Sequence, residues 1–288
     1  HQNYDRNFRA EPEDARSTWR FPELITPGGR FGVKGIILAA GSATRMRPLS
    51  DSMPKCLLPV GGKPILQRII ENVAAAGVEH IGLVVGYNAD AIRSFVKHHF
   101  PFLRIRFIVN PRYESTNNAF SLLMAREFFL SEAKRGAPVH DLMMLDADIV
   151  FSPKLLPFLL ARESPNKVAV RVEGDHDEEE VRVKVDEGRN ILLVGKTTPL
   201  ADSFGESIGI GVFSSLAAQR LFEIVEDRVR LGNGRTEFYE ASFQALIDEG
   251  VELKAIDVSS FPSVEIDTPA DLRVAEKMIE AQTDSGAT

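Results

Sequence analysis

Positively charged side chains follow a short hydrophobic segment in the stretch "GIILAAGSATRMRPLSDSMPKC", residues 35–56. A turn of small residues is followed by Arg45, Arg47 and Lys55. Small residues let a ligand approach the backbone closely, so that N–H groups can donate to phosphate oxygens. Arginine binds phosphate through a forked pair of N–H groups, and lysine adds a compact positive charge. We therefore expect this turn to bind a nucleoside triphosphate, with Arg45 and Lys55 as catalytic residues that stabilise the leaving pyrophosphate.

The spacing of these residues differs from that of the common phosphate-binding motifs. A Walker loop needs G-x-x-x-x-G-K-[ST], and the dinucleotide fingerprint needs G-x-G-x-x-G; neither pattern is present in this stretch. Instead, Arg45 lies four residues after Gly41, and Lys55 lies ten residues further on. Taken in isolation, the arginines could equally be surface charges on an ordinary loop. The lone cysteine, Cys56, has no obvious base partner and is expected to be a buried apolar residue.

Two aspartates follow the apolar run "LMML" near the middle of the chain. Charged groups at the tip of a hydrophobic strand need a partner. Mg²⁺ suits Asp148, because this hard cation is held by one or two carboxylates together with substrate phosphates. Asp146 could take part in the site, cap the strand end, or accept a hydrogen bond beside the metal ligands.

Strand-like and helix-like segments must position these side chains, and they alternate from residue 34 to residue 148. Unbroken apolar runs are typical of buried parallel strands, and apolar residues at helical spacing predict the helices between them. The alternation predicts an α/β fold with a mainly parallel sheet and helices on both faces. Ligands bind such sheets beyond the carboxyl ends of the strands. The expected strands are 34–40, 80–86, 104–110 and 141–148, and the expected helices are 64–77, 89–100 and 118–130.

The remainder of the chain is richer in strands before helices return. The segment "DEGRN" reads as a hairpin turn, and Thr268 with Asp271 forms a capping box at the start of the last helix. We expect strands within 166–172, 180–196, 207–214 and 252–258, and helices at about 214–228 and 236–249.

We expect one catalytic domain over residues 31–288, preceded by an N-terminal extension over residues 1–30. Its nucleotide-binding half covers about 34–150, and its acceptor-binding half covers about 151–282. The acidic run at 173–180 is expected to be a solvated loop.

The overall composition limits the possible partners. The net charge of −7 argues against general nucleic-acid binding, which needs a basic face. A single cysteine cannot form an intrachain disulfide, which fits a reducing, cytoplasmic location. There is no apolar run near 18 residues and no signal peptide, so no membrane partner is expected. A homo-oligomer is possible.

The stretch "LAAGSATRMRPLS…MPKCLLPVGGKPIL" resembles the signature of the nucleotidyltransferases that activate sugar 1-phosphates and phosphocholine. Their pattern is L-A-A-G-x-G-x-R-x-x-P-L-T, followed by P-K and then K-P, and the resemblance covers roughly residues 34–280. It implies a Rossmann-like three-layer sandwich with a mainly parallel mixed sheet, similar to nucleotide-diphospho-sugar transferases. Ala43 replaces a glycine of the pattern, so we expect that residue 43 does not need a positive φ.

The resemblance also assigns roles to single residues. It implies Mg²⁺ ligands at Asp148 and at Asp267, although Asp267 alone could be a helix cap. Glu265 lies close to Asp267 in the sequence but is expected to point to the other face if this segment is extended. The segment "NNAFSLL" is similar to the phosphocholine cytidylyltransferase branch, although Asn117 could merely cap a helix. The implied nucleotide-binding residues are Leu38, Ala39, Ala40, Gly41, Ser42, Ala43, Asn110, Asn117, Asn118, Ser121 and Asp146.

The acceptor side is the least defined. The resemblance implies that Lys196 contacts the acceptor phosphate, although a solvated lysine would look the same. In "RTEFYEASF", carboxylates and aromatic rings could hold a cationic group, and we expect Glu237 and Tyr239 to bind the acceptor. Val181 and Val264 stand where the phosphocholine enzymes are expected to have aromatic residues, so the acceptor stays open.

These features favour a Mg²⁺-dependent nucleotidyltransferase that moves CMP from CTP onto phosphocholine or a related phosphonate and releases pyrophosphate. A sugar-1-phosphate nucleotidyltransferase is the first alternative. A catalytically silent, nucleotide-binding regulatory subunit is the second, but such a protein should have lost a metal-binding aspartate or the phosphate-binding cations.

Overall fold

The computed structural model describes residues 32–131, 140–172, 180–232 and 234–285. The expected N-terminal extension over residues 1–30 lies outside these residues, as does most of the acidic run at 173–180. Within the described residues, no helix has both the length and the apolar character needed to cross a bilayer.

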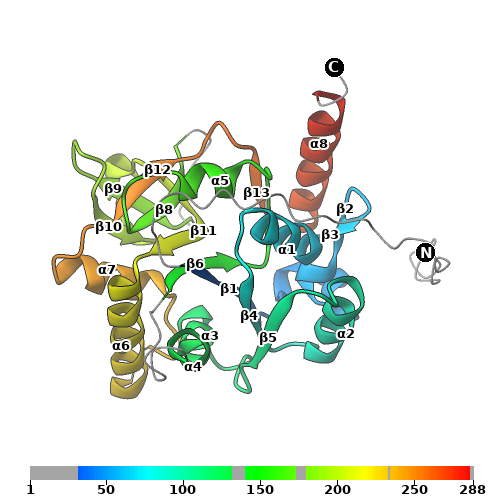
Figure 1. Ribbon diagram of the computed structural model, residues 1–288. Helices are drawn as coiled ribbons and strands as arrows, with labels where there is room; N and C mark the ends of the chain where they lie inside the picture. Colours follow the sequence, from blue (N-terminus) through cyan, green and yellow to red (C-terminus); the bar gives the residue numbers. More distant parts are fainter. Residues whose placement is uncertain (1–31, 132–139, 173–179, 233, 286–288) are drawn as a thin grey trace.

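A nine-stranded mixed sheet forms the centre of the molecule (Figure 1). The central strand β1 (Val33–Ala39) pairs in parallel with β4 (His80–Val85) on one side and with β6 (Asp141–Asp146) on the other. Strand β5 (Arg104–Val109) extends the parallel part, and β11 (Gly205–Phe213) runs antiparallel to β6. The remaining strands of this sheet are β8 (Lys167–Arg171), β9 (Arg182–Val185), β10 (Ile191–Gly195) and β12 (Lys254–Asp257).

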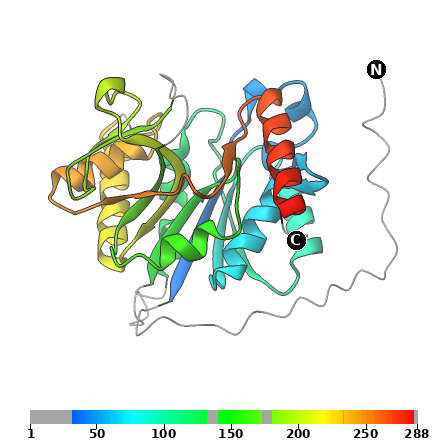
Figure 2. The same cartoon turned by 90° about the horizontal axis from the view of Figure 1, so that it is seen from above.

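Helices cover both faces of the sheet, so the molecule has three layers (Figures 1 and 2). On one face lie α1 (Ile65–Ala75), α2 (Ala89–His99) and α5 (Leu155–Leu160). The opposite face is covered by α3 (Asn118–Met124), α4 (Arg126–Leu130), α6 (Ser215–Leu231) and α7 (Glu240–Asp248). This arrangement confirms the expected three-layer α/β fold.

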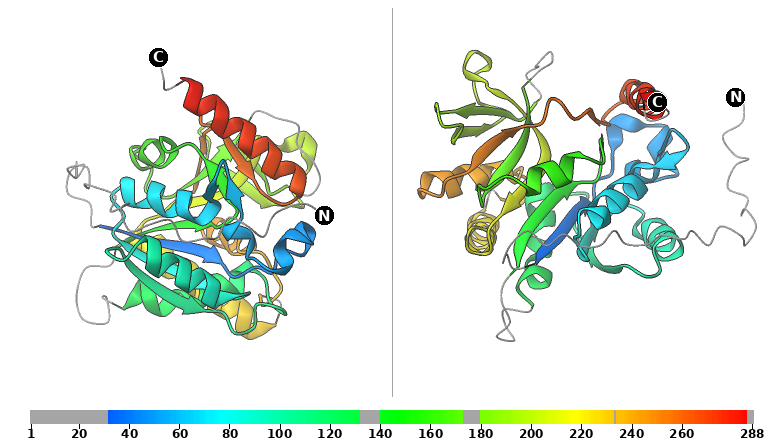
Figure 3. Two further views of the ribbon diagram at one scale, coloured as in Figure 1. Left: turned by 90° about the vertical axis from the view of Figure 1, so that its right-hand side faces the viewer. Right: turned by 45° about the horizontal axis from the view of Figure 1, so that its top comes forward.

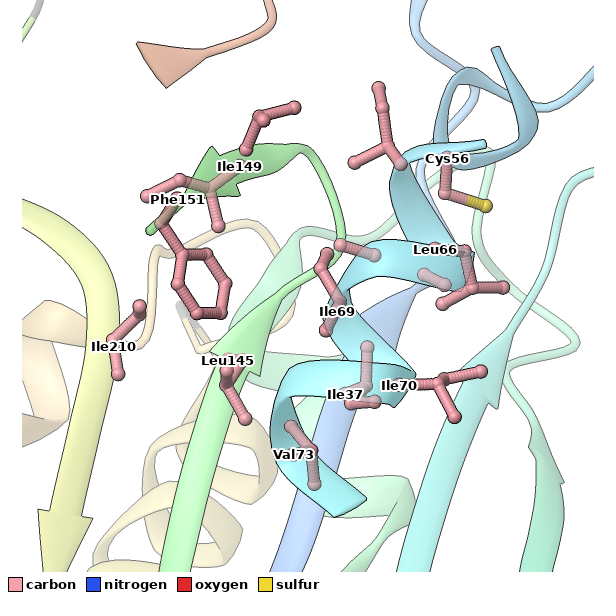
Figure 4. Close-up of a cluster of buried hydrophobic side chains, with 14 of the residues drawn as sticks. Ile37, Cys56, Leu66, Ile69, Ile70, Val73, Leu145, Ile149, Phe151 and Ile210 are labelled. Atoms are coloured by element: carbon pink, nitrogen blue, oxygen red, sulfur yellow. The ribbon is translucent and has the colours of Figure 1, made fainter. Parts of the chain in front are cut away.

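The alternation of side chains along the central strands builds two hydrophobic cores. In β1, Ile37 faces the core under α1, whereas Ile36 and Leu38 face the other core. The same alternation places Leu145 of β6 in the first core, beside Ile69 of α1 (Figure 4). Both faces of these strands are buried, which explains why their sequences read as unbroken apolar runs.

Two short strands and a long helix complete the fold near the carboxyl ends of β1 and β6. Strand β7 (Ile149–Phe151) follows β6 directly and pairs with β13 (Ser263–Glu265), which comes from far along the chain. After β13, helix α8 (Pro269–Ser285) runs along the outside of the domain beside the hairpin of β2 (Pro59–Val60) and β3 (Lys63–Pro64) (Figure 3).

The structure differs from the sequence-based expectation in two helical regions. The helix expected over 118–130 is divided at Ala125 into α3 and α4. The helix expected from residue 236 begins only at Glu240, because the backbone N–H of Tyr239 is bound by the side chain of Asn118 from another helix. A tertiary hydrogen bond of this kind leaves no periodic signal in the sequence.

Candidate active site

The first two elements of the site are the adjacent carboxyl ends of β1 and β6. Leu38 and Asp146 are register partners in the parallel pair, and the Ala147 N–H donates to the Leu38 carbonyl at 3.2 Å. The side chains of Leu38, Ala39 and Ala40 are buried in the hydrophobic cores, so only backbone of this segment can face a ligand. Gly41 follows with open space at the position of a Cβ atom.

The turn after β1 contains a non-glycine residue in the left-handed region. Ala43 has φ 48° and ψ 49° and precedes a single turn of 3₁₀-helix at Thr44–Met46. The expectation that residue 43 does not need a positive φ is therefore wrong. This conformation costs alanine about 1–2 kcal/mol relative to the right-handed region. Hydrogen bonds from the Ser50 hydroxyl (2.8 Å) and the Met46 N–H (3.0 Å) to the Ala43 carbonyl hold the turn in place.

Three acidic side chains meet beyond these strand ends. Carboxylate oxygens of Asp148, Glu265 and Asp267 lie within 4.8 Å of one another. Asp148 lies in the turn between β6 and β7, and the β7–β13 pairing brings the other two alongside it. The Ile266 N–H also donates to the Asp148 carbonyl at 2.8 Å. The expected meeting of two aspartates that are distant in sequence is thus a direct result of one short antiparallel ladder.

Glu265 belongs to this cluster, although the sequence interpretation placed it on the other face. Side chains alternate along an extended segment, so residues 265 and 267 share a face and only Ile266 points away. Ile266 is indeed fully buried. The period-two pattern in "VEIDT" was the signal that could have identified Glu265.

The two catalytic cations predicted from the sequence contact this acidic cluster. The Lys55 Nζ lies 2.7 Å from Asp148 Oδ2 and 3.0 Å from Asp267 Oδ1. The Arg45 Nη2 lies 2.9 Å from Asp267 Oδ2. Arg47 points elsewhere and pairs with Asp51 on the surface at 3.3 Å. Lys55 and Arg45 therefore share the site with the acids, and Arg47 does not.

Charge and burial perturb the titration of the cluster. Burial lowers the pKa of Lys55, but the carboxylates of Asp148 and Asp267 outweigh this effect and raise the pKa above its ordinary value, so Lys55 is cationic. Glu265 as a whole is exposed, but protein atoms around its carboxyl group reduce the contact of this group with water. Together with the charges of Asp148 and Asp267, this raises the pKa of Glu265 to about 8. At neutral pH Glu265 is therefore mostly protonated, and Lys55 and Arg45 balance the charges of the two aspartates.

The acidic cluster fits a hard divalent cation. Within the described chain, the buried Asp148 Oδ1 has no hydrogen-bond partner. An unpaired buried carboxylate oxygen is costly unless a cation or donor binds it. All three side chains offer oxygen ligands, which Mg²⁺ and similar ions prefer. These acids could therefore hold a metal ion.

Asp267 is not used as a helix cap. The side chain of Asp271 accepts the backbone N–H groups of Asp267 (3.0 Å) and Thr268 (2.6 Å). One of the two hydrogen bonds of the predicted capping box is therefore formed, from the Thr268 N–H to the Asp271 carboxylate. The Thr268 hydroxyl donates to Asp271 instead of accepting a backbone N–H of the helix. Because Asp271 performs the capping, both oxygens of Asp267 are directed at Lys55 and Arg45.

The polar residues predicted to bind nucleotide form hydrogen bonds inside the protein. The buried Asn110 side chain donates to the hydroxyls of Thr116 and Ser121, each at 3.1 Å, and accepts from the Arg112 N–H. This network shapes the loop between β5 and α3. Asn117 caps α3 by accepting the N–H of the next residue, as its alternative interpretation proposed.

Asn118 and Tyr239 join the nucleotide-side segment to the acceptor-side segment. Asn118 Oδ1 accepts the Tyr239 N–H at 2.8 Å, and the buried Tyr239 hydroxyl donates to Asp146 Oδ2 at 2.6 Å. A Cβ atom on Gly209, which has φ +72°, would lie 2.6 Å from the same Asp146 oxygen. Only glycine therefore fits where β11 passes this aspartate. Asp146 lies beside the acidic cluster without joining it.

The side chains predicted to bind the acceptor have different surroundings. Glu237 pairs with Arg228 of α6 at 2.8 Å. Lys196, at the end of β10, is exposed, and its Nζ lies 4.9 Å from the centre of the Phe238 ring. Glu240, a further carboxylate of "RTEFYEASF", is not among the residues predicted to bind the acceptor. It is buried, and burial raises its pKa to about 7.

The chain is similar in sequence to one known protein family and to known enzymes. A family model described as the MobA-like NTP transferase domain matches residues 35–229. The chain is 35% identical over 137 residues to a CMP-5'-(3-aminopropyl)phosphonate synthase of Streptomyces rubellomurinus, covering 48% of this chain and 20% of that protein. It is 27% identical over 258 residues to a CTP:phosphoglutamine cytidylyltransferase of Campylobacter jejuni, covering 84% and 98%.

A solved structure has the same fold. The structure of CTP:phosphocholine cytidylyltransferase from Streptococcus pneumoniae matches 86% of this chain and 100% of that chain, with a TM-score of 0.68 and 20% identity. The first curated relatives are longer proteins, and the chain spans from about a fifth to about half of their lengths.

Proposed function

Because the chain belongs to the family of MobA-like NTP transferase domains, we propose that it transfers CMP from CTP to a small phosphorylated or phosphonylated acceptor and releases pyrophosphate. Phosphocholine and aminoalkyl phosphonates exemplify such acceptors. The observation that carries this proposal is the meeting of Lys55 and Arg45 with Asp148, Glu265 and Asp267 beyond the carboxyl ends of β1 and β6.

The names of the similar proteins support the choice of CTP and of the acceptor class. Two name CTP as the substrate and the third names a CMP conjugate as the product. Their acceptors differ, but each combines a phosphate or phosphonate group with a nitrogen-containing small molecule. A hexose 1-phosphate lacks that nitrogen.

The chemistry requires little from a general base. A phosphate monoester has a second pKa of about 6, so the acceptor is already largely a dianion at neutral pH. One acceptor oxygen attacks the α-phosphorus of CTP, and the bond from this phosphorus to the β-phosphate oxygen breaks. The electron pair of that bond leaves with pyrophosphate. Such a transfer depends mainly on position and on charge stabilisation.

Arg45 and Lys55 stabilise the triphosphate and the leaving pyrophosphate in this proposal. Lys55 is largely buried, with 14% of its side chain exposed, so its charge acts with little screening by water. Arg45 is more exposed and can offer two parallel N–H groups to phosphate oxygens. The backbone N–H groups of the turn after β1, over residues 40–43, approach the phosphates from the strand end.

Asp148 and Asp267 would hold Mg²⁺, with Glu265 as a further oxygen ligand. When bound, the ion adds positive charge to the reacting phosphates and helps to orient them. The protein's part is to keep these oxygens together through the β7–β13 ladder. Asn110, Asn117, Asn118, Ser121 and Asp146 support the nucleotide pocket in this proposal, mainly through the internal hydrogen bonds described above.

A screen of pyrophosphate release tests the proposal. Each of four nucleoside triphosphates is combined with phosphocholine, 2-aminoethylphosphonate, inositol phosphate or a hexose 1-phosphate in the presence of Mg²⁺. We expect turnover with CTP and a nitrogen-containing acceptor. Turnover only with another nucleotide and a hexose phosphate would identify a sugar-1-phosphate nucleotidyltransferase instead. Absence of turnover with every pair, despite tight nucleotide binding, would favour the silent regulatory subunit.

A further inference from the structure

Glu240, the first residue of α7, has a buried carboxyl group that the fold does not fully satisfy. The residue is only 5% exposed, and its Oε2 atom has no hydrogen-bond partner among the residues that the structure describes. Burying a carboxylate without a partner costs free energy. An unpaired oxygen of this kind is a reason to look for a ligand that supplies a donor or a positive charge.

The neighbouring polar side chains already have partners. The Tyr239 hydroxyl donates to Asp146 and lies near enough to Glu240 to favour its charged form, and the Glu237 carboxylate is bound by Arg228. Lys196 is near enough to favour the charged form of Glu240, but its Nζ lies over the Phe238 ring, 4.9 Å from the ring centre. Glu240 therefore keeps an acceptor oxygen that its own surroundings leave unused.

The position of Glu240 relates it to the acidic cluster. Tyr239, which directly precedes Glu240, donates its hydroxyl to Asp146 at 2.6 Å, and Asp146 lies two residues before Asp148 in the sequence. Glu240 is therefore connected, through its neighbour Tyr239, to the strand end that carries the acidic cluster. Arg45 and Lys55, at the acidic cluster, attract the anionic end of an acceptor, whereas Glu240 attracts a cationic end.

We propose that Glu240 binds the cationic nitrogen of a zwitterionic acceptor, such as an aminoalkyl phosphonate or aminoalkyl phosphate, and so determines acceptor specificity. This inference rests on the proposed nucleotidyl transfer and extends it to the acceptor class. An ammonium group would supply the missing partner of Oε2, whereas a neutral chain or a sugar would leave the oxygen unpaired. The penalty for an unpaired buried charge is what makes such a site selective.

A matched pair of acceptors isolates the nitrogen. 2-Aminoethylphosphonate and propylphosphonate have chains of equal length and differ by an ammonium group in place of a methyl group. Steady-state kinetics of pyrophosphate release at saturating CTP gives kcat and KM for each. We expect the wild-type protein to favour the amine by about 10-fold or more in kcat/KM, as a charged hydrogen bond implies.

The variant Glu240→Gln keeps the size of the side chain and removes its charge. We expect it to raise KM for 2-aminoethylphosphonate by about 10-fold or more, while turnover of propylphosphonate stays close to that of the wild type. The retained propylphosphonate activity shows that the variant is folded. Asp248→Asn, at the exposed far end of α7, is the control and should preserve the preference for the amine.

Three outcomes would overturn the inference. An equal loss for both acceptors in Glu240→Gln would mean that Glu240 is structural. Equal use of both acceptors by the wild type would remove its role in specificity and leave nucleotidyl transfer intact. No pyrophosphate release with any acceptor would overturn the proposed function as well. If Glu240→Gln does not fold, Glu240→Asp replaces it in the test. The aspartate keeps the charge but is shorter by one methylene, so this variant should weaken only the preference for the amine.

Discussion

Replacing Lys55 by glutamine separates its two roles, as partner of the acidic cluster and as a cation in catalysis. The Lys55 Nζ lies within 3.0 Å of both Asp148 and Asp267. Without it, carboxylates whose oxygens lie within 4.8 Å of one another face each other directly. At an effective dielectric constant of about 20, each such pair repels by about 3 kcal/mol. Arg45 and solvent compensate for part of this repulsion.

We therefore expect Lys55→Gln to lower the free energy of unfolding by about 2–4 kcal/mol when no divalent cation is present. Added Mg²⁺ or Mn²⁺ should restore most of this loss, because the ion no longer competes with Lys55 for the carboxylates. The shift in melting temperature on adding the ion should thus be larger in the variant than in the wild type. Turnover should nevertheless fall by about 10²–10³-fold, since a cation that stabilises the leaving group is gone.

Thermal unfolding across a titration of Mn²⁺, together with pyrophosphate release, measures both effects. Lys184→Gln is the matched control, because Lys184 forms an exposed ion pair with Asp202 away from the site. It should change neither the metal response nor the turnover. The reasoning would be refuted if Lys55→Gln turned over like the wild type, or if the ion stabilised the variant less than the wild type.

Three further predictions concern the acids and the turn. Asp148→Asn should abolish turnover and the Mn²⁺-dependent rise in melting temperature while the protein stays folded, and wild-type activity would exclude Asp148 as a metal ligand. The pKa of Glu240 is raised from 4.5 to about 7, so its contribution to stability is complete below pH 4.5 and is lost as the pH rises through 7. Urea unfolding at pH 5 and pH 8 should show Glu240→Gln losing about 2.5 kcal/mol less than the wild type between these values, and equal losses would contradict the burial argument. Ala43→Gly should raise the free energy of unfolding by about 0.5–1 kcal/mol by removing the left-handed strain, and a decrease on urea unfolding would show that the alanine fits its conformation without cost.

The sequence predicts the layered fold well because its signals are local. The unbroken apolar run in β1 indicates a strand that is buried on both faces. The helical spacing of apolar residues in α1 indicates a helix that is buried on one face. The family model covers residues 35–229 and therefore ends before β13. The two acids at the end of β13 and just after it were predicted only in part, because Asp267 matched a known pattern whereas Glu265 depended on the direction of a side chain.

The site could not be predicted where long-range hydrogen bonds decide which side chains remain available. Glu237 and Tyr239 look as suitable for a ligand as Glu240 does in the sequence. In the folded protein, Arg228 and Asp146 occupy the first two. The left-handed conformation of Ala43 has a similar origin, because Ser50 and Met46 hold a carbonyl whose position no local propensity encodes.

The antiparallel contact between β7 and β13 has a consequence for the newly synthesised protein. A ribosome that has completed the sheet up to β12 has produced Arg45, Lys55 and Asp148, but not yet Glu265 or Asp267. At that stage Lys55 has only one of its two carboxylate partners, Asp148. The unfinished domain therefore has an excess of positive charge at this strand end and lacks two of the three acids that could hold a divalent ion. The three acids can come together only after residues 263–267 have been synthesised and β13 has paired with β7.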